Sequence, residues 1–196
     1  MEDKFEVLIE GLLEHQYGNA DTFIGPELTA SLRQQLESVY EAGIMKPAGI
    51  GQHFSYEKNL KIRGDLIYWL EKEHSAAEKA FLEHIEAFID HLNRTCYTGI
   101  NAYEFHFARY EAGSFYKRHL DQFKSDQGRK YSLVTYLNEN WEPKDAGQLL
   151  LFSEANPVEI FPTGGRAVFF KSDEIEHEVK AGNRARMSIA GWLKRV

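Results

Sequence analysis

The apolar residues in the first half of the chain recur at spacings of three and four, the pattern that predicts amphipathic helices. Three stretches show this spacing, at residues 5–13, 28–40 and 81–92. Gly18 is expected to end the first helix and Gly43 the second, because glycine frequently terminates helices. Ser75 and Glu78 form a capping-box pattern at the start of the third. We expect these helices to serve as scaffold.

From Ala102 onward the apolar period changes to two, which is typical of strands with one buried face. Strand-like segments separated by Gly, Asn and Pro turns cover residues 102–108, 115–123, 131–137, 148–152, 166–170, 176–179 and 185–193. This run of short strands predicts a double-stranded β-helix, which is a cupin-like jelly roll. The predicted class is mainly β with helices (α+β), and the N-terminal and central helices are expected to pack on one outer sheet face.

The length of 196 residues predicts one domain with a core of its own. We expect a helical N-terminal portion over residues 1–95 and a jelly-roll core over about 97–196. Residues 44–70 join the second and third predicted helices, and a long connection in a compact domain is usually functional or disordered. Glycines at 49 and 51 favour a mobile excursion, and the apolar alternation after Asp65 predicts a return to a strand. We interpret residues 48–61 as a lid.

Composition narrows the classes of partner. A net charge of −7 without long basic runs argues against nucleic acid or an anionic membrane. No apolar run is long enough to span a bilayer, and the N-terminus has charges where a signal peptide has an apolar core. Cys96 is the only cysteine, so no internal disulfide can form, and we expect it to be a buried small apolar residue. These features predict a cytoplasmic protein.

The strongest chemical signal is the pair His119 and Asp121. Residues two apart in a strand project from the same face, so an imidazole nitrogen and a carboxylate oxygen can meet one metal ion. His177, in another strand-like segment, is a candidate third ligand. Two histidines and one carboxylate leave three adjacent positions open, which suits Fe(II) and O2. Two alternatives remain. One is a surface hydrogen bond between His119 and Asp121 without a metal, and the other is a pair of metal ligands formed by His84 and His91.

Arg186 points to a co-substrate. It lies across a turn from His177, and Ser188 and Trp192 share its face if the strand is regular. A guanidinium inside a barrel needs an anion, and its planar fork matches a carboxylate. A 2-oxo acid that chelates the metal would bring its distal carboxylate to this arginine, which is the geometry that 2-oxoglutarate demands. Arg184 falls on the same face, and a structural salt bridge is a second interpretation of Arg186.

In this order, these residues resemble the Fe(II)- and 2-oxoglutarate-dependent dioxygenases. More narrowly, they are similar to the prolyl 4-hydroxylase superfamily, close to the oxygen-sensing prolyl hydroxylases and their bacterial relatives. The resemblance extends from about Gly49 to Trp192 and is carried by Ile62-Arg-Gly-Asp65 with Trp69, Arg118-His-Leu-Asp121, Tyr136-Leu-Asn138 with Trp141, Gly147, His177-Glu-Val179 and Arg186-x-Ser188.

The resemblance implies roles for single residues. It makes His119, Asp121 and His177 the iron ligands. It implies a co-substrate pocket formed by Arg186, Tyr110, Tyr136, Ser188, Leu149 and Trp192. The implied lid includes Gly49, Ile50 and Gly51, and a salt bridge is expected between Asp65 and Arg129. No side chain beyond the metal ligands is expected to be catalytic.

The implied function is hydroxylation of a protein substrate at a prolyl residue. The co-substrates would be O2 and 2-oxoglutarate, the products succinate and CO2, and ascorbate is the candidate reductant. Bacterial members of the family act on a translation elongation factor, which is one candidate substrate. Three alternatives remain: an oxygenase of the same mechanism that acts on a free amino acid or small molecule, another metal-dependent jelly-roll enzyme such as a cupin isomerase, and a catalytically silent binding module. A halogenase is disfavoured because halide needs the position of Asp121.

Overall fold

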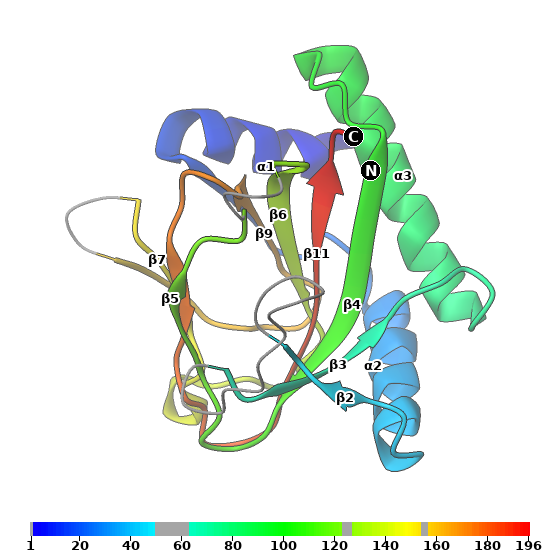
Figure 1. The fold of residues 1–196 in the computed structure, drawn as a ribbon, viewed down its shortest axis with the longest axis vertical. Helices are drawn as coiled ribbons and strands as arrows, with labels where there is room; N and C mark the ends of the chain where they lie inside the picture. Colours follow the sequence, from blue (N-terminus) through cyan, green and yellow to red (C-terminus); the bar gives the residue numbers. More distant parts are fainter. Residues whose placement is uncertain (1, 50–62, 123–126, 154–156) are drawn as a thin grey trace.

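The computed structural model describes residues 2–49, 63–122, 127–153 and 157–196 (Figure 1). Its helices are α1 (Glu2–His15), α2 (Pro26–Glu41) and α3 (Ala76–Cys96), with a 3₁₀ turn at Pro143–Asp145. Its strands are β1 (Tyr17–Ala20), β2 (Lys46–Pro47), β3 (Asp65–Trp69), β4 (Ala102–Tyr110), β5 (Tyr116–His119), β6 (Arg129–Tyr136), β7 (Leu149–Leu151), β8 (Val158–Ile160), β9 (Ala167–Lys171), β10 (His177–Val179) and β11 (Arg186–Lys194). Each predicted helix and strand has a counterpart among them.

The strands form two antiparallel sheets that make up the jelly roll. The larger sheet has the order β1-β9-β6-β11-β4-β3-β2, and the smaller has the order β5-β10-β7-β8. Figure 1 shows α2 and α3 on the side of the larger sheet that faces away from β5 and β7, and Phe5 of α1 packs against Phe88 of α3. The prediction of a jelly roll with helices on one outer sheet face is therefore confirmed.

Alternation along β4 divides the core into two layers. Phe105 and Phe107 belong to a buried cluster that includes apolar side chains of all three helices. Ala108 and Tyr110 belong to a second cluster, which lies between the sheets and includes Leu149. Fully burying one phenylalanine contributes about 1.5–3 kcal/mol, so the outer layer anchors the larger sheet to the helices. The layer between the two sheets can therefore contain polar side chains in addition to its apolar cluster.

The first half of the chain differs from the expectation in two respects. Besides the predicted strand after Asp65, it contains β1 and β2, which form the two edges of the larger sheet. In addition, α1 ends at His15, while Gly18 lies in β1 with no room for a Cβ, which would come within 2.1 Å of the Leu8 carbonyl oxygen. Glycine is required there so that α1 can approach the strand.

Two further expectations, the capping box at the start of α3 and the burial of Cys96 at its end, differ from the structure. Ser75 caps the helix by accepting a hydrogen bond from the Glu78 amide. The Glu78 carboxylate, however, accepts from the Glu71 amide and from Gln35, so only half of the capping box forms. Cys96 was expected to be buried, and it is exposed because it is the last residue of the helix.

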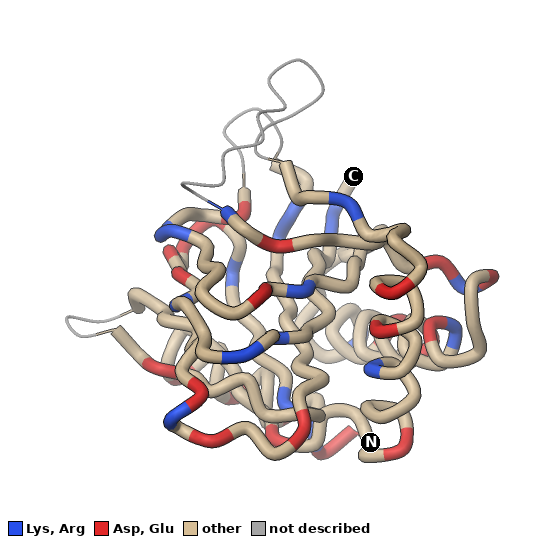
Figure 2. Tube along the Cα trace, turned by 90° about the horizontal axis from the view of Figure 1, so that it is seen from below, with Lys and Arg blue, Asp and Glu red and all other residues tan. Residues whose placement is uncertain are grey.

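Charged residues of both signs are interspersed along the chain trace (Figure 2). Within the described ranges, no helix combines the length and the apolar character needed to cross a bilayer. The segment after Asp65 returns as β3, as predicted. The lid residues Ile50 and Gly51 lie outside the described residues.

Candidate active site

His119, Asp121 and His177 converge at the edge of the smaller sheet. β5 and β10 are antiparallel neighbours, and their register places His119 directly opposite His177. The two imidazole rings are 4.2 Å apart between centroids. Asp121 Oδ1 lies 3.5 Å from His119 Nε2, and Asp121 Oδ2 lies 3.5 Å from His177 Nε2. Potential ligand atoms of the three residues all lie within 4.8 Å of one another, so one cation can contact all three.

Backbone carbonyls orient both histidines. His119 Nδ1 lies 2.7 Å from the Lys117 carbonyl oxygen, and His177 Nδ1 lies 3.3 Å from that of Ile175. An Nδ1–H that donates to a carbonyl leaves the lone pair of Nε2 free for a metal. Burial lowers the pKa of His177 to about 4, against the attraction of Asp121, so this imidazole is neutral at pH 7.

The carboxylate of Asp121 is held by the opposite sheet. Ser132 in β6 donates to Asp121 Oδ2 at 2.7 Å, and its hydroxyl lies 2.9 Å from that of Ser172. Burial raises the pKa of Asp121, but the two histidines and the Ser132 hydrogen bond outweigh burial and hold it well below its usual range. His177 and Asp121 are therefore in the protonation states that metal binding needs. Two imidazoles and one carboxylate, open on one side, fit Fe(II).

Arg186 lies at the start of β11 with 3% of its surface exposed. Its Nε donates to the Gly147 carbonyl and its Nη1 to Ser188 Oγ, at 3.1 and 3.4 Å. The rings of Tyr110 and Tyr136 flank the guanidinium, with centroids 5.2 and 5.1 Å from Cζ. Among the described residues, no carboxylate forms an ion pair with it. The alternative of a structural salt bridge is therefore not supported, and the buried charge has capacity for an anionic ligand.

The two tyrosines beside Arg186 are neutral. Burial raises the pKa of Tyr110, and it also raises that of Tyr136. The Tyr136 hydroxyl is buried and makes no hydrogen bond to a described residue, which leaves it available to a ligand. Arg184, the alternative in the other register, is exposed, forms an ion pair with Asp145 and stacks on Trp141. Arg186 is thus the arginine that faces the interior.

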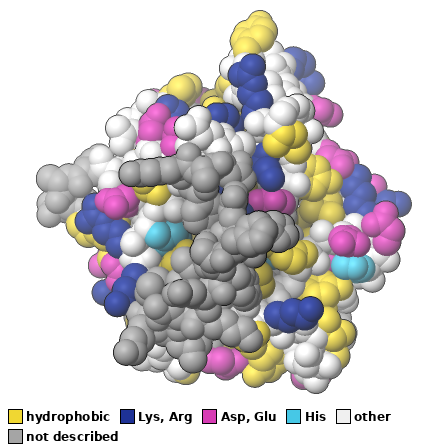
Figure 3. Space-filling model, viewed as in Figure 1, with side chains coloured by type: hydrophobic (Ala, Val, Ile, Leu, Met, Phe, Trp, Pro, Cys, Tyr) yellow, Lys and Arg dark blue, Asp and Glu magenta, His cyan; other side chains and the backbone are white. Residues whose placement is uncertain are grey.

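One cavity joins these groups, and we call it the inner cavity. It is lined by most of the predicted site residues, namely His119, Asp121, His177, Arg186, Tyr110, Ser188, Leu149 and Trp192. It adjoins an outer cavity of about 470 Å³, whose lining includes Gly49, Ile67, Trp69 and Leu120. Figure 3 shows hydrophobic side chains on this face of the molecule. The outer cavity can therefore hold a ligand with apolar groups.

The predicted ion pair between Asp65 and Arg129 is wrong. Asp65 is bound through both oxygens by Arg63, at 2.6 and 2.8 Å, because the two residues lie two apart at the start of β3. Arg129 instead pairs with Glu104 at 2.8 Å and lies over the ring of Trp192, 3.4 Å from its centroid. β6 and β4 flank β11, so this ion pair spans the strand that carries Trp192.

Several residues at the site escaped prediction. Ser132 was not singled out, although its strand position on β6 was predicted. Arg63 lies over the ring of Tyr116, which stacks on His119 at 3.6 Å between centroids. His106 lines both cavities. A signal for His106 was present, because it lies four residues before Tyr110 on the same face of β4.

The alternative ligand pair of His84 and His91 is not supported. His91 Nε2 contacts Glu6 at 2.5 Å, while His84 packs edge-on against Phe23. Among the described residues, only His119, Asp121 and His177 form a group that could hold a metal ion. The metal chemistry of the described residues is thus concentrated at one place.

Comparison with known proteins identifies a matching family model and similar solved structures. A family model described as "2OG-Fe(II) oxygenase superfamily" matches residues 105–194. A solved prolyl-4-hydroxylase from Pseudomonas putida is 32% identical, with a TM-score of 0.89 and coverage of 98% of this chain and 99% of that one. A prolyl hydroxylase in complex with a hypoxia-inducible factor oxygen degradation domain peptide fragment from Trichoplax adhaerens is 27% identical, with a TM-score of 0.87 and coverage of 98% and 90%.

Curated relatives are longer than this chain. The hypoxia-inducible factor prolyl hydroxylase of Caenorhabditis elegans is 30% identical over 95% of this chain and 28% of that protein. Egl nine homolog 1 of Homo sapiens is 28% identical over 95% of this chain and 46% of that protein. The chain therefore spans less than half the length of these two relatives.

Proposed function

This chain belongs to the 2OG-Fe(II) oxygenase superfamily, among its prolyl hydroxylases, and on that premise we propose that it hydroxylates a prolyl residue of a protein or peptide. The proposed cofactor is Fe(II), the co-substrates are O2 and 2-oxoglutarate, and the products besides the hydroxylated substrate are succinate and CO2. We treat residues 1–196 as one catalytic domain.

One observation carries the proposal. The three candidate metal ligands line the same inner cavity as the guanidinium of Arg186, which forms no ion pair with a described residue. A five-carbon dicarboxylate with an oxo group at one end matches this arrangement, since one end can chelate a cation while the other accepts hydrogen bonds from the guanidinium. An enzyme that used the metal without an oxo acid would have no use for Arg186.

The residues of the cavity bind and orient. His119, Asp121 and His177 would hold Fe(II), which supplies the oxidative chemistry when bound with O2 and the oxo acid. Arg186 and the neutral Tyr136 hydroxyl would donate to the distal carboxylate. Leu149 packs in the apolar cluster between the sheets and excludes water from the metal side. No side chain is required as general acid or base.

The outer cavity supports a peptide as the substrate. Its apolar lining suits side chains next to the reacting residue, and the Trichoplax neighbour was solved with a peptide. Gly49 lines this cavity at the base of the proposed lid. A translation elongation factor is one candidate source of the peptide. The single exposed cysteine supports a reducing, cytoplasmic setting, and ascorbate is the proposed reductant.

The test is an incubation of the protein with Fe(II), 2-oxoglutarate, ascorbate and cell extract, followed by a search for peptides that gain one oxygen. We expect oxygen gain at prolyl residues together with succinate formation, and neither with His119→Ala. His91→Ala is the matched control, because this histidine lies on α3 outside the cavities. Succinate formation that rises only with a free amino acid would show a small-molecule oxygenase. Absence of succinate under all conditions would refute the proposal.

A further inference from the structure

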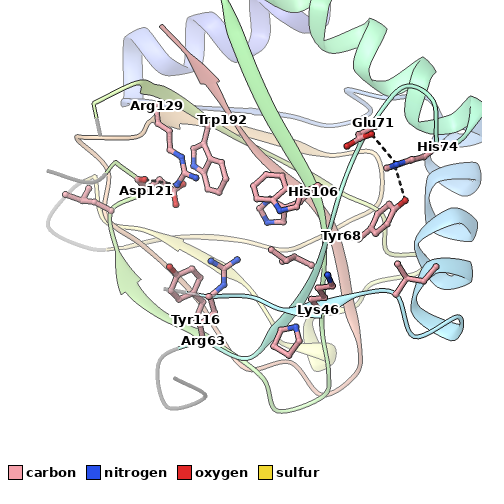
Figure 4. Close-up of a pocket in the computed structure, with 16 residues that line it drawn as sticks. Lys46, Arg63, Tyr68, Glu71, His74, His106, Tyr116, Asp121, Arg129 and Trp192 are labelled. Carbon is pink, nitrogen blue, oxygen red and sulfur yellow. Dashed lines mark hydrogen bonds and ion pairs between the residues drawn. The ribbon is translucent and has the colours of Figure 1, made fainter. Parts of the chain in front are cut away.

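Two buried nitrogen atoms that have no hydrogen-bond partner among the described residues belong to side chains that line both the inner and the outer cavity. His106 and Trp192 line both cavities, and their side chains appear together in Figure 4. His106 is 2% exposed and Trp192 is 7% exposed. Neither His106 Nδ1 nor Trp192 Nε1 makes a hydrogen bond to a described residue. Leaving a buried polar atom unpaired costs about 1–3 kcal/mol, so two at one place need an explanation.

Among the residues that the structure describes, none offers a hydrogen-bond partner to His106 Nδ1. Its ring packs against Trp69 at 4.9 Å and against Trp192 at 5.5 Å between centroids. In the sheet it lies between Trp69 on β3 and Ala190 on β11. The ring therefore packs against two indole rings, in a position where leucine or phenylalanine would leave no polar atom unpaired. Arg129, in contrast, covers the far face of Trp192 and is paired with Glu104.

Resting on the function proposed above, we propose that His106 and the indole N–H of Trp192 form a pair of hydrogen-bond donors that binds the main-chain carbonyl groups flanking the substrate prolyl residue. A prolyl residue has no backbone N–H, so its peptide bonds present only acceptors. The indole is a donor only, and a neutral imidazole always has one N–H to donate. A site that offers only hydrogen-bond donors therefore suits a prolyl residue better than other residues, because the backbone N–H of any other residue would need an acceptor.

The imidazole is kept in its neutral form. Burial lowers the pKa of His106 to about 3, and the charge of Arg63 acts in the same direction. A neutral ring can bind a carbonyl without attracting the anionic co-substrate into the outer cavity. The role proposed for His106 is one of specificity, since it would contact the substrate next to the reacting residue.

The test compares four variants on one defined probe, a synthetic library of peptides that each carry one central proline between randomised flanks. His106→Leu removes the polar atoms at similar size, His106→Asn keeps a donor near Nδ1, and Trp192→Phe keeps an aromatic ring without the N–H. His84→Leu is the control, because His84 also has a buried unpaired nitrogen but lies on α3. Oxygen gain gives KM and kcat, and retention on immobilised Mn(II)-loaded protein gives binding.

We expect His106→Leu and Trp192→Phe each to raise the peptide KM and weaken retention by about fivefold, the worth of one neutral hydrogen bond, with a smaller change in kcat. His106→Asn should stay within about twofold of the wild type, and His84→Leu should match it. If His106→Leu bound the peptides as tightly as the wild type, or if His106→Asn lost as much binding as His106→Leu, the inference would be wrong while the proposed function would still stand. If the wild type forms succinate but oxidises no library peptide, the peptide substrate fails, and the inference fails with it.

Discussion

Removing the hydroxyl of Ser132 should weaken metal binding although Ser132 is not a ligand. In the structure this hydroxyl donates to Asp121 Oδ2 at 2.7 Å and connects it to Ser172. It is the side-chain contact that ties the carboxylate to the larger sheet, while both histidines belong to the smaller one. In Ser132→Ala the carboxylate can rotate away from the two imidazoles. The expected effect is therefore on metal affinity.

The expected change in metal affinity follows from the energy of the hydrogen bond between Ser132 and Asp121. A hydrogen bond to a charged group contributes about 1.5–3 kcal/mol, and each 1.4 kcal/mol is a factor of about ten. Ser132 is 1% exposed, so water does not replace the lost donor readily. Ser132→Ala should thus raise the Kd for Mn(II) by roughly 10- to 100-fold, the range seen when groups that orient metal ligands are removed. Ser172→Ala leaves the bond to Asp121 in place and should cost less than about threefold.

The assay is calorimetric titration of the metal-free protein with Mn(II), with a thermal melt of each variant. Thr135→Val is the matched control, because Thr135 lies on the same strand with a buried hydroxyl that has no partner among the described residues. It should leave the Kd within about twofold and should not lower stability. A Kd for Ser132→Ala within twofold of the wild type, or an equal loss in Thr135→Val, would refute the reasoning.

Three further predictions follow from other contacts. Arg186→Lys should raise the Kd for 2-oxoglutarate at least about tenfold, because it loses the fork geometry, while Arg184→Ala should change it less than about twofold, as titration of the Mn(II)-loaded protein would reveal. Arg63→Met should lower the free energy of unfolding by about 3–5 kcal/mol in urea, since the Asp65 carboxylate is left buried and unpaired, and the double change with Asp65→Leu should recover part of the loss. The folded-state pKa of His106 lies below its unfolded value of 6.5, so the unfolded state binds more protons and stability falls as pH drops from about 6.5 toward 4. His106→Leu should flatten this fall by about 1.4 kcal/mol per pH unit, and urea titrations at several pH values that show an unchanged slope would contradict the assignment.

The metal ligands and the arginine of the co-substrate pocket could be predicted from the sequence. The spacing of His119 and Asp121 led to the prediction that both meet one cation, and they do come together although β5 ends at His119 and Asp121 follows it. The antiparallel register of β5 and β10 then brings His177 opposite His119. The same period of two placed Arg184, Arg186 and Ser188 on one face, and the family resemblance selected Arg186 from the two arginines. These assignments combine local alternation, which is readable without knowledge of the tertiary structure, with the family resemblance.

Contacts between distant elements were not readable in the same way. The bond from Ser132 to Asp121 joins two sheets, and the pairing of Arg129 with Glu104 depends on which strands flank β11. The pairing of Asp65 with Arg129 was an implication of the family resemblance, and in the structure the nearer Arg63 binds the Asp65 carboxylate instead. The strand β1 was missed because a short segment with Gly18 carries almost no periodic signal.

The most direct test of the central claim is a spectroscopic titration of the Fe(II)-loaded protein with 2-oxoglutarate in the absence of O2. Chelation of Fe(II) by the oxo acid gives a visible charge-transfer absorption, so the measurement reports the cation and the diacid in one cavity. We predict a saturable band in the wild type, no band in His119→Ala, and a band only at far higher 2-oxoglutarate in Arg186→Leu. A wild-type protein without the band, or an Arg186→Leu variant that saturates at the same concentration, would contradict the account.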